Sequence, residues 1–145
     1  MKVRTHAAFG VAASVAVAFA IVWGFVLAGS PSSRRRERLD EQRLRDLQTI
    51  ASEIQSLVVH QDGKTELKEP LPRTLEEAVK IARGERLNPR DPETGEFYRY
   101  TVKYETTFEL CARFTTTRES DFRVFWNHPA GEHCFTIDVL DPPPY

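Results

Sequence analysis

Apolar and polar residues are distributed very unevenly along this chain. The run from Ala7 to Ala28 contains no Asp, Glu, Lys or Arg. At a rise of about 1.5 Å per residue, a helix of that length matches the roughly 30 Å hydrocarbon core of a bilayer. A charged side chain at mid-membrane costs roughly 3 kcal/mol, so the absence of charge over the whole run is informative. The pattern predicts an uncleaved transmembrane helix, with residues 1–29 as the anchor.

A cleaved signal peptide is the main alternative for this segment. Lys2 and Arg4 supply a basic start, and Ala28 before Gly29 loosely fits a cleavage site. The apolar run is nevertheless longer than the roughly 7–15 residues of a signal-peptide core. We therefore favour the uncleaved helix.

The second segment, residues 30–60, has the periodicity of a juxtamembrane amphipathic helix. From about Ser33 to Val59, apolar residues recur at intervals of three and four, which places them on one stripe. Because a sheet further along the chain needs a helix to cover it, we expect this stripe to be core. Two i,i+4 pairs, Arg36–Asp40 and Glu41–Arg45, have the spacing of helical ion pairs. The stripe consists of Leu44, Leu47, Ala51, Ile54 and Val58.

Residues 61–145 combine one short helix with the alternation typical of strands. Thr74 and Glu77 form a capping box, which predicts a helix up to Arg83 that stops at Gly84. A turn-rich stretch precedes the alternating part, in which every second residue is apolar. The predicted fold class is therefore α+β, with the two N-terminal helices followed by a head of one short helix and a small antiparallel meander. The expected strands cover residues 97–104, 107–114, 122–126 and 134–140, and the first places Tyr98, Tyr100, Val102 and Tyr104 on one face.

Cys111 and Cys134 are the only cysteines of the chain. The alternation places each of them on the face opposite the apolar residues of its strand. Because a free cysteine prefers the interior, two on the same outer face favour a disulfide. A disulfide requires an oxidising compartment, and two unpaired thiols are the alternative.

The basic residues that flank the apolar run indicate the other orientation, with the head in the cytoplasm. Four arginines follow it closely, and by the positive-inside rule they keep the following domain in the cytoplasm. The cysteine argument instead places the head outside the cytoplasm, and we expect that orientation in the cell membrane. The cluster fits either a surface for anionic lipid headgroups or a solvated helix start with paired charges. These membrane-flanking basic residues are Arg34, Arg35, Arg36 and Arg38.

Composition and motifs argue against several functions. Lys and Arg number 20 and Asp and Glu 21, so the chain lacks the basic surplus that nucleic-acid binding requires. We find no catalytic motif, cofactor motif or small-molecule substrate site and expect none. His128, His133 and Cys134 are the one cluster considered for a metal, and Asp91, Glu93 and Glu96 the one considered for calcium; neither has a standard ligand spacing.

Two resemblances add to this interpretation. The apolar helix, Leu71-Pro72-x-Thr74-Leu75 and Asp91-Pro92-x-Thr94-Gly95-x-x-Tyr98-x-Tyr100 resemble type IV pilins and the pseudopilins of type II secretion, although Val15 stands where a pilin has glutamate. Nearly the whole chain more closely resembles the C-terminal region of uncharacterised bacterial membrane proteins. That resemblance is carried by Asp40-Glu41-Gln42-Arg43, Phe108-Glu109-Leu110-Cys111-Ala112 and Trp126-x-His128-Pro129-Ala130-Gly131. The first implies a pilin-like head, whereas the second supplies no known function.

Together these features predict a non-enzymatic, single-pass membrane protein. We expect an accessory or interaction subunit of a membrane or envelope complex, in contact with the lipid bilayer and with other envelope proteins. One alternative is a pilin-like component that assembles into a fibre. The other is a metal-binding or enzymatic head around His128 and His133.

Overall fold

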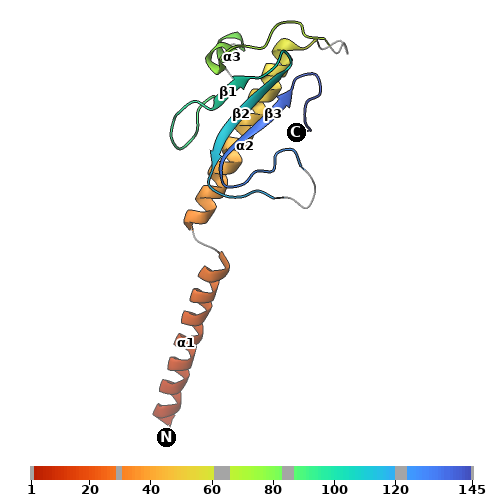
Figure 1. Cartoon of the computed structure of the whole chain (residues 1–145). Coiled ribbons are helices and arrows are strands. Elements are labelled where there is room, and N and C mark those ends of the chain that lie inside the picture. Colours follow the sequence, from red (N-terminus) through yellow and green to blue (C-terminus); the bar gives the residue numbers. More distant parts are fainter. Residues whose placement is uncertain (1, 29–30, 61–65, 83–86, 120–123, 145) are drawn as a thin grey trace. The chain divides into compact units, whose positions relative to one another are not determined.

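The computed structural model describes residues 2–28, 31–60, 66–82, 87–119 and 124–144. Over these residues the chain forms three helices and three strands, shown in Figure 1. It divides into two compact units, residues 1–35 and 36–145, and we call the second unit the head. The head therefore includes most of the segment that the sequence predicts as a separate juxtamembrane helix.

Helix α1 (Lys2–Ala28) contains the predicted membrane span. Where its side chains are described, the large apolar ones are more than half exposed. Over the residues whose side chains the structure describes, no helix is both long enough and apolar enough to cross a membrane. The predicted transmembrane helix is therefore not confirmed. The exposed apolar residues are Val11, Val15, Val17, Phe19, Ile21, Val22, Trp23 and Val26.

Helix α2 (Pro31–Val58) supplies one side of the head's core. All five residues of the predicted stripe are buried, which confirms that it is core. Ile50 is buried as well, because it lies on the same side as Leu47 and Ile54. The predicted ion pair between Glu41 and Arg45 forms at 3.7 Å on the helix surface.

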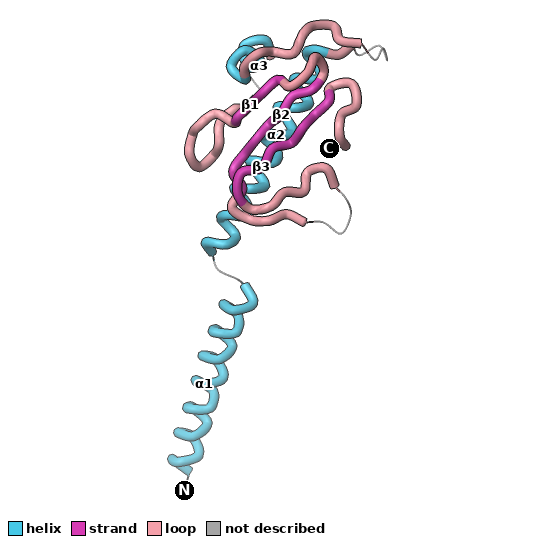
Figure 2. The backbone as a smooth tube through the Cα atoms, viewed as in Figure 1, coloured by secondary structure: helices cyan, strands magenta, loops and turns pink. Residues whose placement is uncertain are grey.

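The sheet is antiparallel, with strand order β1-β2-β3, and α2 runs behind it in Figure 2. Its strands are β1 (Arg99–Val102), β2 (Thr107–Phe114) and β3 (Gly131–Asp138). Phe108 and Leu110 on β2 lie opposite Ile137 and Phe135 on β3, and all four are buried. The predicted α+β class with an antiparallel meander is thus confirmed.

Two details of the predicted strands are wrong. The first strand ends at Val102, two residues earlier than predicted, and Tyr104 beyond it is 75% exposed. The chain turns back there, because the Lys103 N–H donates to the Thr107 carbonyl at 2.9 Å. The strand expected at 122–126 is also not found: 122 and 123 lie outside the described residues, and 124–126 form no strand.

Helix α3 (Leu75–Ile81) begins at the predicted cap. The Thr74 hydroxyl accepts from the Glu77 N–H at 3.2 Å, which confirms the first half of the capping box. The Glu77 carboxylate accepts from the Arg73 N–H at 2.7 Å, one residue before the expected donor. The expected stop at Gly84 lies outside the described residues. Leu75 and Ala78 anchor the helix in the core.

Candidate functional site

A buried arginine on α2 makes five hydrogen bonds to side chains of the head. The Arg43 side chain is 3% exposed. Its Nε and Nη2 donate to the two carboxylate oxygens of Asp91 at 2.6 and 3.1 Å. The same Nη2 donates to Glu93 at 2.7 Å, and Nη1 donates to Asp40 at 2.8 Å. We refer to these four residues as the Arg43 cluster.

Two loops deliver the partners of Arg43. Asp91 begins a turn in which its own carboxylate accepts from the Glu93 and Thr94 N–H groups at 2.8 and 3.0 Å. Gly95 ends that turn with a φ of 73°, a conformation that favours glycine. Asp40 faces the residues after β2 and accepts from the Thr115 and Thr116 N–H groups at 3.0 and 2.7 Å. The cluster therefore joins α2 to both ends of the sheet's first hairpin.

Arg43, Asp40 and Asp91 keep their charges because the pKa of each is shifted in favour of the ionised form. Burial by itself raises the pKa of Asp40, but hydrogen bonds from Thr115, Thr116 and Arg43 outweigh it and hold the pKa below its ordinary value. For Asp91 too, hydrogen bonds outweigh the effect of burial and lower the pKa, and Arg43 is the main donor. Hydrogen bonds to Asp91, Glu93 and Asp40 raise the pKa of Arg43 against the effect of burial. A group that neither gains nor loses a proton near neutral pH suits a structural role better than acid–base catalysis.

The Arg43 cluster includes two of the three residues, Asp91, Glu93 and Glu96, that were considered from the sequence as calcium ligands. Asp91 and Glu93 already surround a cation, the Arg43 guanidinium, which takes the position that a metal ion would need. Glu96 contributes a backbone carbonyl to the turn, where it accepts from the Asp91 N–H at 2.8 Å. The carboxylates of Asp91 and Glu93 therefore bind the guanidinium of Arg43 in this structure.

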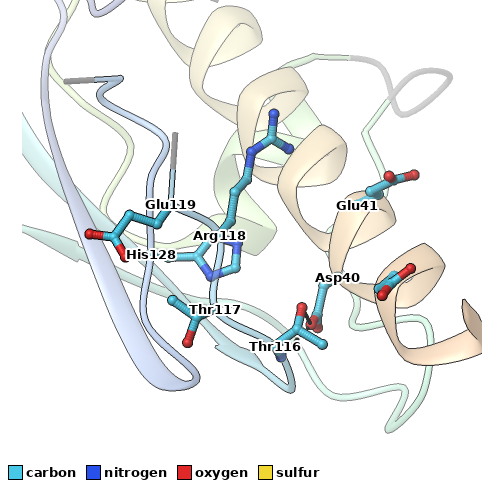
Figure 3. A pocket seen from close by; sticks show the side chains of 8 residues that line it. Asp40, Glu41, Thr116, Thr117, Arg118, Glu119 and His128 are labelled. Carbon is cyan, nitrogen blue, oxygen red and sulfur yellow. Dashed lines mark hydrogen bonds between the residues drawn. The ribbon is translucent and has the colours of Figure 1, made fainter. Parts of the chain in front are cut away.

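Beside the cluster lies a cleft of about 430 Å³, shown in Figure 3. One wall is the α2 face with Glu37, Asp40 and Glu41, and the other is the segment from Thr116 to Glu119. His128 also lines the cleft and is 4% exposed. Four of the eight lining residues are acidic.

His128 is held by packing and by backbone pairing. Its ring stacks on Phe114 with centroids 3.6 Å apart, and its backbone exchanges two hydrogen bonds with Arg118 at 2.9 and 3.1 Å. Nδ1 lies 3.3 Å from the Pro129 carbonyl oxygen. Burial lowers the pKa of His128, and the Pro129 carbonyl and the charge of Asp40 do not offset that effect. His128 is therefore a neutral, largely structural histidine at neutral pH.

No set of metal ligands around His128 and His133 is found in the described part of the chain. His133 packs edge-on against Phe135 with centroids 4.8 Å apart. The ligand-like group present is Glu109 with Cys111 and Cys134. Because the two sulfurs are bonded to each other, that group does not offer a thiolate.

The two cysteines face each other across β2 and β3. Cys111 and Cys134 are direct partners in the register, and their sulfurs lie 2.11 Å apart, at disulfide distance. Both stand on the outer face of the sheet, as the alternation predicts. Arg99 on β1 donates to the two sulfurs at 3.4 and 3.2 Å and pairs with Glu132 at 2.9 Å. Next to the bridge is a second cleft of about 730 Å³ whose lining includes Phe97, Arg113 and Arg43.

The membrane-flanking arginines lie at the start of α2. Arg34, Arg35, Arg36 and Arg38 occupy the first two turns of α2, where residues 32–38 are all exposed. Of the four, Arg36 alone lines a cleft, the second one. Arg43, Asp91 and Glu93 line the same cleft.

Sequence reasoning missed the Arg43 cluster, although the helical period contains a signal for it. Asp40 and Arg43 continue the apolar stripe toward the N-terminus at the same spacing as Leu47, Ala51 and Ile54. A charged pair on the buried side of an amphipathic helix indicates a buried ion pair. The sequence interpretation instead treated both residues as part of a solvated charge run.

Comparison of the chain with models of known families, with curated proteins and with solved structures finds no match. The functional argument therefore depends on the geometry above.

Proposed function

We propose that this chain is a non-enzymatic, single-pass membrane protein whose α+β head serves as an accessory or interaction subunit of a membrane or envelope complex. The observation that carries the proposal is the exposed apolar surface of α1. Eight large apolar side chains between Val11 and Val26 are each at least 54% exposed. A contiguous apolar surface of that kind marks a contact with lipid or with another protein. The uncharged run from Ala7 to Ala28 supports lipid.

The head's polar chemistry supports a binding role rather than catalysis. Its most buried charges, those of Arg43 and Asp40, are satisfied by each other and by backbone groups. Features on the surface of the head are suited to binding a partner. Strand β1 is an edge of the sheet, and Tyr104 just beyond it is exposed. An edge strand with an exposed aromatic neighbour is a common place for a partner strand or loop to bind.

Membrane attachment is tested by fractionating cells that produce the full chain. We expect it to remain in the membrane pellet after a high-salt wash and an alkaline wash, because burial of an apolar helix does not depend on ionic contacts. The matched change is Val17→Lys with Ile21→Lys in α1, which should release the chain. Release of the unchanged chain by the washes would contradict the anchor.

Orientation is tested through the two cysteines. The disulfide distance between Cys111 and Cys134 supports a head outside the cytoplasm, because disulfides persist in oxidising compartments. In intact cells, a membrane-impermeant thiol reagent should label both residues only after reduction. Labelling that needs permeabilisation but no reductant would place the head in the cytoplasm, as the arginine cluster implies.

A pilin-like component that assembles into a fibre is a second candidate. One observation favours it: a single long helix, α2, lies against a small antiparallel meander (Figure 1). Fibre assembly predicts removal of the residues up to Gly10, and mass spectrometry of the N-terminus of the cellular protein tests this. An intact N-terminus would exclude it.

A further inference from the structure

The outer face of the sheet places a cationic side chain directly against the disulfide. The register pairs Arg99 on β1 with Cys111 on β2, and Cys111 with Cys134 on β3. One nitrogen of the Arg99 guanidinium, Nη2, donates to Cys111 Sγ at 3.4 Å and to Cys134 Sγ at 3.2 Å. Each sulfur therefore has a positively charged donor within hydrogen-bond reach.

Carboxylates on the same face oppose part of this positive charge. Glu132 pairs with Nη1 of Arg99 at 2.9 Å, which leaves Nη2 directed at the sulfurs. A carboxylate oxygen of Glu109 lies within 4.8 Å of both sulfurs, and Lys103 pairs with Glu109 at 2.9 Å. Because Lys103 offsets the charge of Glu109 in turn, the guanidinium that donates to the sulfurs is only partly opposed.

The bridge is open to a small reagent. Helix α2 runs behind the sheet in Figure 2, and the bridge lies on the other face. Cys134 is partly exposed, whereas Cys111 is 4% exposed. Cys111 and Arg99 line the second cleft, whose volume of about 730 Å³ is in the range of small-molecule sites. A low-molecular-weight thiol can therefore reach the bridge.

We propose that the bridge between Cys111 and Cys134 is a reactive disulfide that exchanges with low-molecular-weight thiols. A thiolate leaves more readily when its pKa is low, and an adjacent arginine lowers the pKa of a cysteine thiol. Arg99 supplies this stabilisation to either sulfur, because it donates to both. The inference goes beyond the proposed binding role and does not depend on the membrane anchor.

The exchange takes place in two steps. The thiolate of a small thiol attacks Sγ of Cys134, the more exposed of the two cysteines, and the electron pair of the S–S bond leaves on Sγ of Cys111. A second small thiol attacks the small-molecule sulfur of the mixed disulfide and releases the Cys134 thiolate. Two small thiols are thereby oxidised to one disulfide, and the bridge gains two electrons. The two protons pass to the cysteine thiolates or to water, and a small disulfide reverses the reaction.

The rate of reduction tests the proposal without any substitution. The full chain in a mild detergent is mixed with 2-mercaptoethanol at about pH 8, where part of the thiol is ionised. Samples are quenched with acid, and their free thiols are alkylated and counted by mass spectrometry. Oxidised glutathione, a fully exposed disulfide, is the benchmark under the same conditions. We expect the bridge to react with a rate constant at least equal to that of the benchmark.

The dependence on thiol concentration shows whether the folded head reacts. We expect a rate that stays proportional to the concentration of 2-mercaptoethanol. A rate constant below that of oxidised glutathione would overturn the proposal. A rate that reaches a plateau as the concentration rises would also overturn it, because the bridge would then react only after the head opens.

The part played by Arg99 is tested on a single thiol. In a Cys111→Ala variant, Cys134 is a free thiol beside Arg99, and iodoacetamide alkylates its thiolate. An opposite charge this close lowers a pKa by roughly one unit, which raises the thiolate fraction near pH 7 about tenfold and lowers its nucleophilicity about threefold. Alkylation should therefore be about threefold faster than after adding Arg99→Gln, with a pH profile displaced to lower pH.

Two further substitutions make this test specific. Arg99→Lys keeps the positive charge and should retain most of the faster alkylation. Arg45→Gln removes a 65% exposed arginine on α2 and should leave the rate and the pH profile unchanged. If Arg99→Gln behaved like Arg45→Gln, the proposal would be overturned.

Reduction of the intact bridge in the same Arg99 and Arg45 variants does not depend on the folding of Cys111→Ala. Arg99→Gln should slow reduction by about threefold, because the leaving thiolate loses its cation. A loosened head or a more exposed bridge would be reduced faster, so slower reduction cannot come from lost structure. Unchanged or faster reduction in Arg99→Gln would overturn the proposal.

Discussion

Replacing Arg43 by methionine should destabilise the head by about 3 kcal/mol. The change removes two donor contacts to Asp91, at 2.6 and 3.1 Å, and one to Asp40 at 2.8 Å. Removing one partner of a buried ion pair costs roughly 3–5 kcal/mol, because the other charge stays buried. Both aspartates keep backbone donors, and Glu93 is half exposed and returns to water. We therefore expect the lower end of that range.

The effect is measured by urea unfolding of the full chain in a mild detergent, followed by near-UV circular dichroism. Arg45→Met is the matched control on the same helix. Arg45 is 65% exposed and pairs with the exposed Glu41, and surface pairs of this kind contribute about 0–1 kcal/mol. The control should therefore unfold at nearly the same urea concentration as the wild type.

The pH dependence separates lost charge pairing from lost packing. The pKa values of Asp40 and Asp91 lie below the ordinary value, so the stability they contribute is present above about pH 4 and lost as the pH falls through their folded pKa values. Without Arg43 both pKa values rise, so the deficit of Arg43→Met should be largest near pH 7 and shrink below about pH 4. The reasoning would be refuted if Arg43→Met lost no more stability than Arg45→Met, or if its loss of stability did not change with pH.

Three further changes test other parts of the head by the same unfolding assay. Reducing the bridge between Cys111 and Cys134, which are 23 residues apart, should lower the free energy of unfolding by about 3 kcal/mol; a Cys111→Ala, Cys134→Ala variant should not respond to reductant. The pKa of His128 is lowered by burial, so the unfolded chain binds more protons and stability should fall as the pH drops below about 6.5. In the His128→Phe variant, the free energy of unfolding should depend less on pH over this range. An unchanged pH dependence would mean that other groups cause it. Thr74→Ala should cost about 1 kcal/mol through loss of the α3 cap, whereas no loss would mean that Glu77 alone satisfies the helix start.

Local periodicity was enough to predict the elements that form the core. The spacing of Leu47, Ala51 and Ile54 placed them on one side of a helix, and the alternation around Phe108 and Leu110 placed these side chains inward on a strand. The same alternation placed Cys111 and Cys134 on the outer face. These predictions succeed because the period of a helix or strand fixes which side chains share a face.

The partners of the charged and edge residues depended on the tertiary structure. Arg43 meets Asp91 48 positions away, and Asp40 meets Thr115 75 positions away. Neither pairing follows from a local period, because it depends on which loops the fold places opposite α2. Tyr104 is a further example. Strand alternation places it on the same face as the buried Tyr98, but the chain turns back after Val102 and leaves Tyr104 exposed. The sequence by itself determined which faces are apolar, and the packing decided which charges are paired, because a charge takes its partner from whatever the fold brings within a few ångströms.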